Sequence, residues 1–294
     1  MKTTNDGLHK FSDFIARLQG KKRFFIMAMC SAFVFSGCAC QCDMEEIKSL
    51  ISSEIQNQLP AKTGSNASKN ALKVVKKHKY FPKTKQELNK LVRDPKVNLG
   101  EINTSKITDM SSLFAMQGLK GDDILATRDY SGIGSWDVSN VENMSFMFQG
   151  AKSFNENINE WNVENVERMH AMFHNAISFN QPLNKWDTSG AEVMTYMFAG
   201  AKAFNQPLNS WNVENVEDMS SMFAGAKAFN QPLNKWDISS VESMSGMFSG
   251  AESFKQNLDT WGDKLDKGVD VDDMFEGSGI ESKTPKWYKK RSRR

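Results

Sequence analysis

The chain has 294 residues, with 37 Lys and Arg against 35 Asp and Glu, 39% hydrophobic residues and 11% aromatic residues. This composition excludes collagen-like, coiled-coil and wholly disordered chains. Charge is segregated along the sequence, because residues 136–282 carry a net charge of −13 and residues 283–294 a net charge of +7. A body at −13 repels phosphate backbones, so we expect no nucleic-acid partner.

The first 37 residues have the features of an export signal. Lys21, Lys22 and Arg23 precede an uncharged, mostly apolar run over residues 24–35. This run is shorter than the roughly 20 residues that a membrane-spanning helix needs, and it has the usual length of a signal-peptide core. We therefore predict a signal peptide over 1–37. The alternative is an amino-terminal anchor that is not cleaved.

The sequence that follows the apolar run resembles a bacterial lipobox. Phe35-Ser36-Gly37-Cys38 is similar to the motif whose cysteine is acylated and becomes the new first residue. The resemblance implies lipidation of Cys38 and an N-terminal lipid anchor in a membrane. It places the protein in the bacterial cell envelope, at the outer membrane or the cell surface. No cysteine follows residue 42, so we do not expect disulfides to hold the body together.

Two segments separate this anchor from the main body. Residues 38–70 predict a lipid-anchored tether and a flexible linker, because a short amphipathic pattern is followed by a small, polar stretch. Residues 71–101 predict a helical cap that precedes the repeats. In this cap, Thr84 followed by Glu87 resembles a capping box that opens a helix over 85–93.

A 25-residue repeat occupies most of residues 102–282. An earlier, partial copy at 102–114 lies 34 residues before the next one, which predicts an insertion within 117–134. One unit cannot bury its aromatic residues alone, so we expect the units to stack and these residues to form the core. The tryptophans in register are Trp136, Trp161, Trp186, Trp211, Trp236 and Trp261, and Met and Phe columns run in the same frame.

Each unit contains two hydrophobic periods. Leu208, Trp211 and Val213 have the spacing of a leucine-rich-repeat strand, and the apolar residues of 216–226 have helical spacing. Gly225 then supplies a residue that tolerates unusual backbone angles. The predicted fold is an α/β repeat solenoid, a leucine-rich-repeat-like right-handed array of about seven 25-residue coils, each a short parallel strand plus a short helix, with a helical N-terminal cap.

The unit W-[DN]-V-x-x-V-x-x-M-x-x-M-F-x-G-A-x-x-F-N-x-x-L resembles the repeat of BspA-like leucine-rich repeat surface proteins. The same family is known as the mycoplasma lipoprotein-associated repeat of unknown function. The resemblance covers about residues 80–275. It implies a surface-exposed bacterial lipoprotein with a binding or adhesive role, and it implies no catalytic residues.

Candidate ligand contacts lie on the predicted strand face, because stacked parallel strands make an extended wall of outward side chains. The alternative is a solvated face without a partner. For the Asn column at 159, 184, 209 and 234, a stacked amide ladder and a polar surface both remain open. The ligand-facing candidates are Glu160, Asn162, Lys185, Asp187, Ser210, Asn212, Lys235 and Asp237.

We predict no metal site and no cofactor. His170 and His174 have the i, i+4 spacing that can hold zinc on a helix, but no third ligand is evident in the sequence. Asp270, Asp272 and Asp273 are not followed by a calcium-binding loop of EF-hand type. For the basic tail at 283–294 we expect a flexible end rather than a site for anionic lipid, lipopolysaccharide or nucleic acid.

These features predict a non-enzymatic scaffold that binds a protein or glycan ligand through the strand face of its repeats. An enzyme would need paired carboxylates or an activated nucleophile in a cleft, which so regular an array does not suggest. The alternative function is a structural or assembly component of the cell envelope with no external ligand.

Overall fold

The computed structural model describes residues 78–116 and 122–291. All of them belong to one compact unit, Val74–Arg294. The signal peptide over 1–37, the lipidation of Cys38 and the tether over 38–70 lie outside the described residues. Within the part that the structure describes, no helix is both long enough and apolar enough to cross a membrane.

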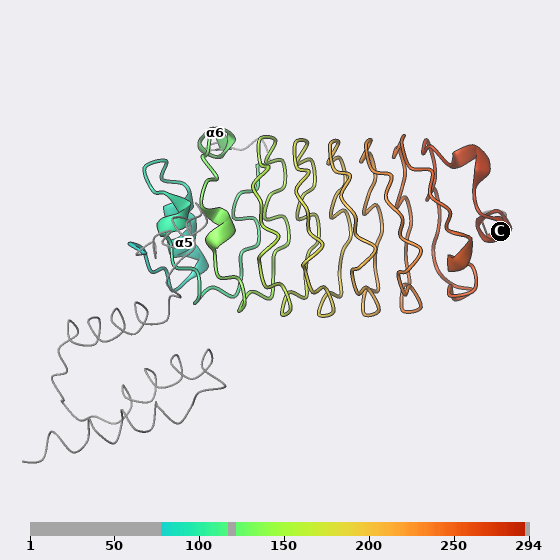
Figure 1. Cartoon of the computed structure of the whole chain (residues 1–294), viewed down its shortest axis with the longest axis horizontal. Coiled ribbons are helices and arrows are strands. Elements are labelled where there is room, and N and C mark those ends of the chain that lie inside the picture. Colours follow the sequence, from blue (N-terminus) through green and yellow to red (C-terminus); the bar gives the residue numbers. More distant parts are fainter. Residues whose placement is uncertain (1–77, 117–121, 292–294) are drawn as a thin grey trace, which may run out of the picture. The chain divides into compact units, whose positions relative to one another are not determined.

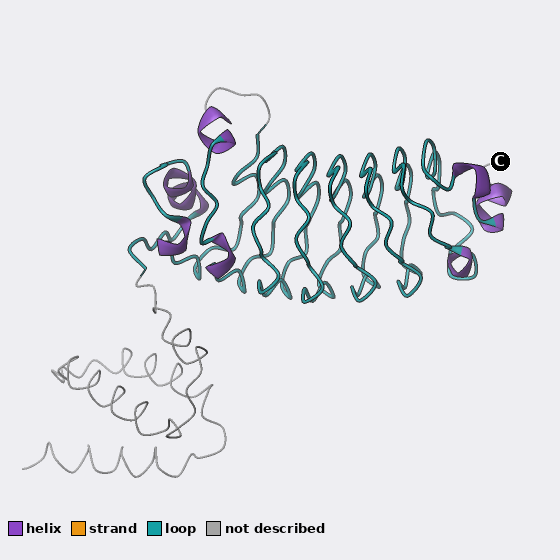
Figure 2. Cartoon of the chain, turned by 45° about the horizontal axis from the view of Figure 1, so that its top comes forward, coloured by secondary structure: helices purple, strands orange, loops and turns teal. Residues whose placement is uncertain are grey.

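The repeats form coils that stack side by side along the long axis of this unit (Figures 1 and 2). Successive coils are joined by isolated parallel β-bridges, which begin with Asp109 to Asn143 and end with Ser243 to Asp270. The bridges between Asn143 and Ser243 join residues 25 apart. The first bridge joins residues 34 apart and the last joins residues 27 apart, so the insertion and the late final copy both appear in the register of the stack.

The segment expected to be a helix forms consecutive turns in every coil. In the coil of Met144, alternate backbone N–H groups donate to the next coil, from Met144 to the carbonyl of Arg168 (2.9 Å) and from Phe146 to that of His170 (2.8 Å). The N–H groups between them close turns within the coil, such as Met147 to Met144 (3.1 Å). Because half of the donors leave the coil, an α-helix cannot form, and the prediction of a short helix in each unit is wrong.

Two columns of left-handed residues make these turns possible. One column passes through Phe146 and Tyr196, with φ of 60° and 56°, and a second passes through Gly225, with φ of 66°. A positive φ at the third turn residue is what a type II turn requires, and glycine adopts it without steric cost. The expectation for Gly225 is therefore confirmed. The second column also contains a non-glycine residue, Asn175, with φ of 58°.

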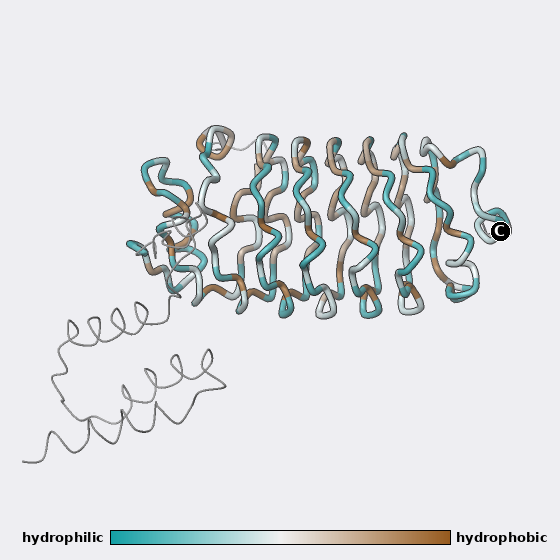
Figure 3. Tube along the Cα trace, in the orientation of Figure 1, coloured by the Kyte–Doolittle hydropathy of each residue, from teal (hydrophilic) through white to brown (hydrophobic). Residues whose placement is uncertain are grey.

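The core consists of the repeated apolar columns, which are buried as the sequence predicts. Phe173 stacks on Phe198 of the next coil with ring centroids 5.4 Å apart, and on Phe179 of its own coil at 4.2 Å. The same stacked arrangement recurs along the array, so two phenylalanine ladders run through its interior. Figure 3 shows hydrophobic segments recurring from coil to coil.

The tryptophans tie neighbouring coils together by hydrogen bonds as well as by packing. The indole Nε1 of Trp211 donates to the carbonyl of Leu183 (3.0 Å), which also accepts from the backbone N–H of Trp186 (3.2 Å). Both acceptor positions of this buried carbonyl are therefore used. The equivalent indole bonds are made by Trp136, Trp161, Trp186, Trp236, Trp261 and Trp287.

Asparagine side chains add a third set of links between coils. The side-chain oxygens of Asn180 and Asn205 accept from the backbone N–H of Asn205 and Asn230, each at 2.9 Å. In the column considered from the sequence, Asn159 donates to Asn184 and Asn209 donates to Asn234, both at 3.1 Å. The continuous ladder therefore runs through residues 155, 180, 205 and 230, and the considered column forms pairs.

The amino-terminal end of the stack is covered by a short helical segment. Helix α5 (Lys85–Val92) has Thr84 as its N-cap, whose hydroxyl accepts from the backbone N–H of Glu87 (3.2 Å), so the predicted helix over 85–93 is confirmed. Leu88 and Val92 are buried against the first coil. The 3₁₀ turn η1 (Leu99–Glu101) follows. The inserted segment contains α6 (Asp122–Ala126), and the 3₁₀ turn η2 (Ile133–Ser135) leads into the first full repeat.

The carboxyl-terminal end has its own cover. After η3 (Asp259–Trp261) and η4 (Glu281–Lys283), helix α7 (Lys286–Arg291) places Trp287 and Tyr288 against the core. Tyr288 contacts Phe275 with ring centroids 4.9 Å apart, and the indole of Trp287 donates to the carbonyl of Leu258 (2.9 Å). The expectation of a flexible basic tail over 283–294 is therefore wrong for residues 286–291. Aromatic burial holds them in place.

Candidate binding surface

The residues predicted to face a ligand form two rows across successive coils. The row that precedes the tryptophans comprises Glu160, Lys185, Ser210 and Lys235, all exposed. Within it, the Lys185 ammonium pairs with the Glu160 carboxylate of the preceding coil, and both side chains are more than half exposed. Such a surface pair contributes little to stability, so this row is available for contacts.

The second predicted row has a structural role that explains its composition. Each of its side chains accepts a hydrogen bond from the backbone N–H two residues later and so closes a turn. Asp and Asn are favoured in such turns because their short side chains reach the backbone. Ser189 bonds lower the pKa of Asp187, the largest cause being the bond from its hydroxyl (2.7 Å). The row comprises Asn162, Asp187, Asn212 and Asp237, of which all but the half-buried Asn212 are exposed.

Sequence reasoning missed a row of glutamates at the start of the turn segment. The backbone N–H of Glu192 donates to the carbonyl of Glu167 (2.9 Å), and that of Glu217 donates to Glu192 (3.1 Å), so the residues lie directly above one another. We call Glu142, Glu167, Glu192, Glu217 and Glu242 the glutamate row. Their 25-residue spacing was the available signal.

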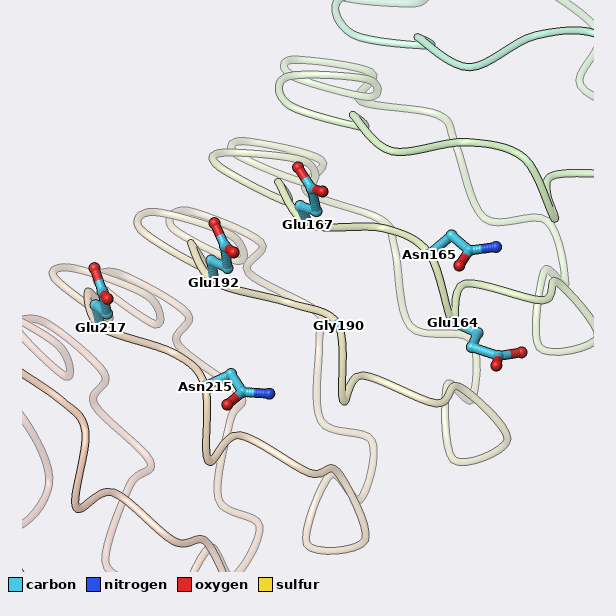
Figure 4. Close-up of a pocket in the computed structure, with 7 residues that line it drawn as sticks. All are labelled: Glu164, Asn165, Glu167, Gly190, Glu192, Asn215 and Glu217. Carbon is cyan, nitrogen blue, oxygen red and sulfur yellow. The ribbon is translucent and has the colours of Figure 1, made fainter.

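The carboxylates of the glutamate row point in the same direction along a shallow groove (Figure 4). One hollow of ≈ 440 Å³ is lined by Glu167, Glu192 and Glu217 with Asn165 and Asn215. A second hollow, of ≈ 430 Å³, shares Asn165 and Glu167 with the first. Among the described residues, Glu167 is the only member of the row in an ion pair, with Arg168 (3.1 Å). Like charges held in register repel one another, so this groove favours cationic groups.

Four ring-bearing side chains gather on the same turn segments. We call Phe146, His170, His174 and Tyr196 the aromatic–imidazole patch. The Phe146 and His170 ring centroids are 4.6 Å apart, and Tyr196 lies 6.0 Å from His170 and 6.2 Å from His174. Tyr196 is 44% exposed, which is unusual for a large hydrophobic residue in this chain.

The two histidines of this patch are engaged by neighbouring polar groups. Nδ1 of His170 is within hydrogen-bonding distance of the Thr195 hydroxyl, and Nδ1 of His174 lies 3.2 Å from Nε2 of Gln149. Burial lowers the pKa of both imidazoles, and the charge of His170 lowers the pKa of His174 further. At neutral pH these side chains are therefore uncharged and act as hydrogen-bonding partners.

The structure describes no group of three or more His, Cys, Asp or Glu side chains placed to hold a metal ion. His170 and His174 lie in one coil, but on consecutive turns rather than on the helix that their spacing suggested. Asp270 is part of the last bridge of the stack, and the carboxylate accepts from the backbone N–H of Asp272 (2.9 Å).

Comparison with known proteins places the repeat body in a family. No curated protein and no solved structure matches the chain. The model of a family described as Mycoplasma protein of unknown function, DUF285, matches residues 122–223 and 184–287. Because these two overlapping matches together cover more than half of the sequence, the chain belongs to this Mycoplasma protein family of unknown function.

Proposed function

We propose that this protein is a lipid-anchored, surface-displayed scaffold of the bacterial envelope that binds another macromolecule without catalysing a reaction. Its stacked coils would constitute a leucine-rich-repeat-like solenoid of the BspA-like kind. The family match supports a repeat protein, and the lipobox-like Phe35-Ser36-Gly37-Cys38 supports the anchor. In this proposal the lipid holds the chain on the membrane, and the repeats present an extended face.

The observation that carries the binding role is the repetition of identical side chains at one spacing along an open groove. Glu167, Glu192 and Glu217 line the same hollow and are fixed relative to one another by backbone hydrogen bonds between coils. A partner with repeated complementary groups would meet several of them at once. Such multipoint contact raises affinity without any deep pocket.

Protease shaving of intact cells that express the full chain tests the display of this scaffold. We expect mass spectrometry to find peptides from 136–275 released from cells with the unaltered protein. Release should fall strongly for Cys38→Ala, because that variant cannot be acylated. Full protection of the repeats in cells with the unaltered protein would refute the surface scaffold and favour a structural component within the envelope.

A pull-down from surface extracts with the purified protein tests the binding role. Glu167→Gln combined with Glu192→Gln and Glu217→Gln removes three charges from the groove and keeps side-chain size. We expect this triple variant to lose the captured partner. A matched variant, Glu156→Gln with Glu252→Gln and Glu276→Gln, removes as many charges elsewhere in the repeats and should retain it. Equal capture by both variants would contradict a role for the groove.

A further inference from the structure

The aromatic–imidazole patch is a departure from the repeat that is confined to neighbouring coils. At the positions equivalent to Phe146 and Tyr196, other coils carry Ser112, Ala171, Ser221 and Gly246. At the positions equivalent to His170, the neighbouring coils carry serine or threonine. Large rings therefore replace small residues at one place on a surface that is otherwise uniform.

The backbone at two of these positions is ill suited to large side chains. Phe146 and Tyr196 have φ of 60° and 56°, in the left-handed region that costs an ordinary residue roughly 1–2 kcal/mol. Packing does not require the Tyr196 ring, because 44% of it is exposed and serine or glycine fills the same position in other coils. Ring-bearing residues at strained, exposed positions are typical of sites that contact a partner.

The charges around the patch are negative. Asp218 is close enough to His170 to act on its ionisation, and the glutamate row lies on the same turn segments. The cation at this place, Arg168, has its guanidinium on Glu167 at 3.1 Å. A partner with positive charge is therefore attracted, and an anionic partner is repelled.

We propose that the aromatic–imidazole patch is the recognition point for a polypeptide segment that carries exposed Arg or Lys side chains. The faces of Tyr196 and Phe146 attract a cation, and the apolar stem of Arg or Lys packs against the rings. Carboxylates of the glutamate row then neutralise further cations along the segment. This inference names the partner class of the proposed scaffold and so rests on that function.

Fluorescence anisotropy of the purified full-length chain tests the proposal. The probe is a labelled oligoarginine peptide at physiological salt, and the comparison is Tyr196→Ser alone and with Phe146→Ser. Neither substitution changes the net charge, and serine occupies the same backbone position at 112 and 221, so both variants should fold. We expect each variant to bind the peptide at least about tenfold more weakly, because a central aromatic contact is lost. The control Ser221→Ala, one coil further along, should bind as the unaltered protein does.

Three results would overturn the proposal. Equal binding by Tyr196→Ser would show that the peptide responds only to the negative charge of the whole body. Binding of a neutral chito-oligosaccharide in preference to oligoarginine would assign the rings to a glycan. Self-association that Tyr196→Ser abolishes would make a second copy of the chain the occupant. The titration uses purified protein, so its failure is distinct from a failure of surface display in the shaving experiment.

Discussion

The indole hydrogen bonds between coils predict an unusual sensitivity at the tryptophan column. Trp211 is 4% exposed, its ring stacks on that of Trp186 at 6.1 Å, and its Nε1 donates to the carbonyl of Leu183 at 3.0 Å. Trp211→Phe keeps an aromatic ring but removes this donor. The Leu183 carbonyl retains the backbone N–H of Trp186, so the lost bond should cost about 0.5–1.5 kcal/mol rather than the larger penalty of an orphaned group.

Packing adds a second cost to the same substitution. Phenylalanine is smaller than tryptophan by roughly 40 Å³, and at about 24 cal/mol per Å³ of cavity this contributes about 1 kcal/mol. We therefore expect Trp211→Phe to lower the free energy of unfolding by about 2 kcal/mol. Trp211→Ala should lower it by about 3–5 kcal/mol from the cavity, in addition to the lost bond.

Urea unfolding of the full chain, followed by circular dichroism, measures both variants. Trp287→Phe is the matched control, because its Nε1 makes the same kind of bond (2.9 Å) but its ring is only half buried at the end of the stack. We expect the control to cost less than half as much as Trp211→Phe. If Trp211→Phe costs less than about 0.5 kcal/mol, or if Trp287→Phe costs as much, the indole bond does not hold the coils together.

Three further predictions concern the turns, the histidines and the end of the stack. Gly225→Ala should cost about 1–2 kcal/mol in urea unfolding, because φ is 66° while the new Cβ meets nothing nearer than 3.8 Å, and Gly225→Asn should cost less, as Asn175 occupies the same column; equal costs would contradict this reasoning. Burial lowers the pKa of His170 and His174 from 6.5, so the stability they allow is present above about pH 6.5 and is lost as pH falls through their folded values; His170→Gln with His174→Gln should flatten that decline, and an unchanged pH profile would exclude their involvement. Deletion of residues 286–294 should speed hydrogen exchange in the last coil more than in the central coils, and uniform exchange would show that α7 is not a cover.

The sequence was sufficient to predict which residues form the interior, but not the backbone that carries them. Val216, Met219 and Phe223 are all buried, as their spacing predicts. The same spacing arises from consecutive turns, which also return a side chain to the interior every three or four residues. What decides between helix and turns is where the N–H groups donate, and here the partners lie in another coil, 24 residues away. A pattern within one unit carries no information about such partners.

The candidate binding residues show a similar division. The Asp and Asn column that includes Asp187 is exposed as predicted, but its composition follows from turn closure. The glutamate row is just as regular and was overlooked because it lies in the segment expected to be a helix. The C-terminal cover had a visible signal, since Trp287 follows Trp261 by 26 residues, nearly one repeat. The aromatic–imidazole patch could not be predicted, because its members come together only when residues of neighbouring coils are placed side by side.

The offset of the contacts between coils sets how this protein can change in size. From Met144 to Met219, N–H groups donate to the carbonyl 24 residues further on, and indole groups reach back 28 residues from Trp161 to Trp261. Removal or duplication of one 25-residue unit within this region gives each group a chemically identical partner. The array is therefore a measuring rod that can gain or lose whole divisions while both end covers stay in place. A gain or loss of any other length would shift the turns of one coil against the next and break the stack at that point.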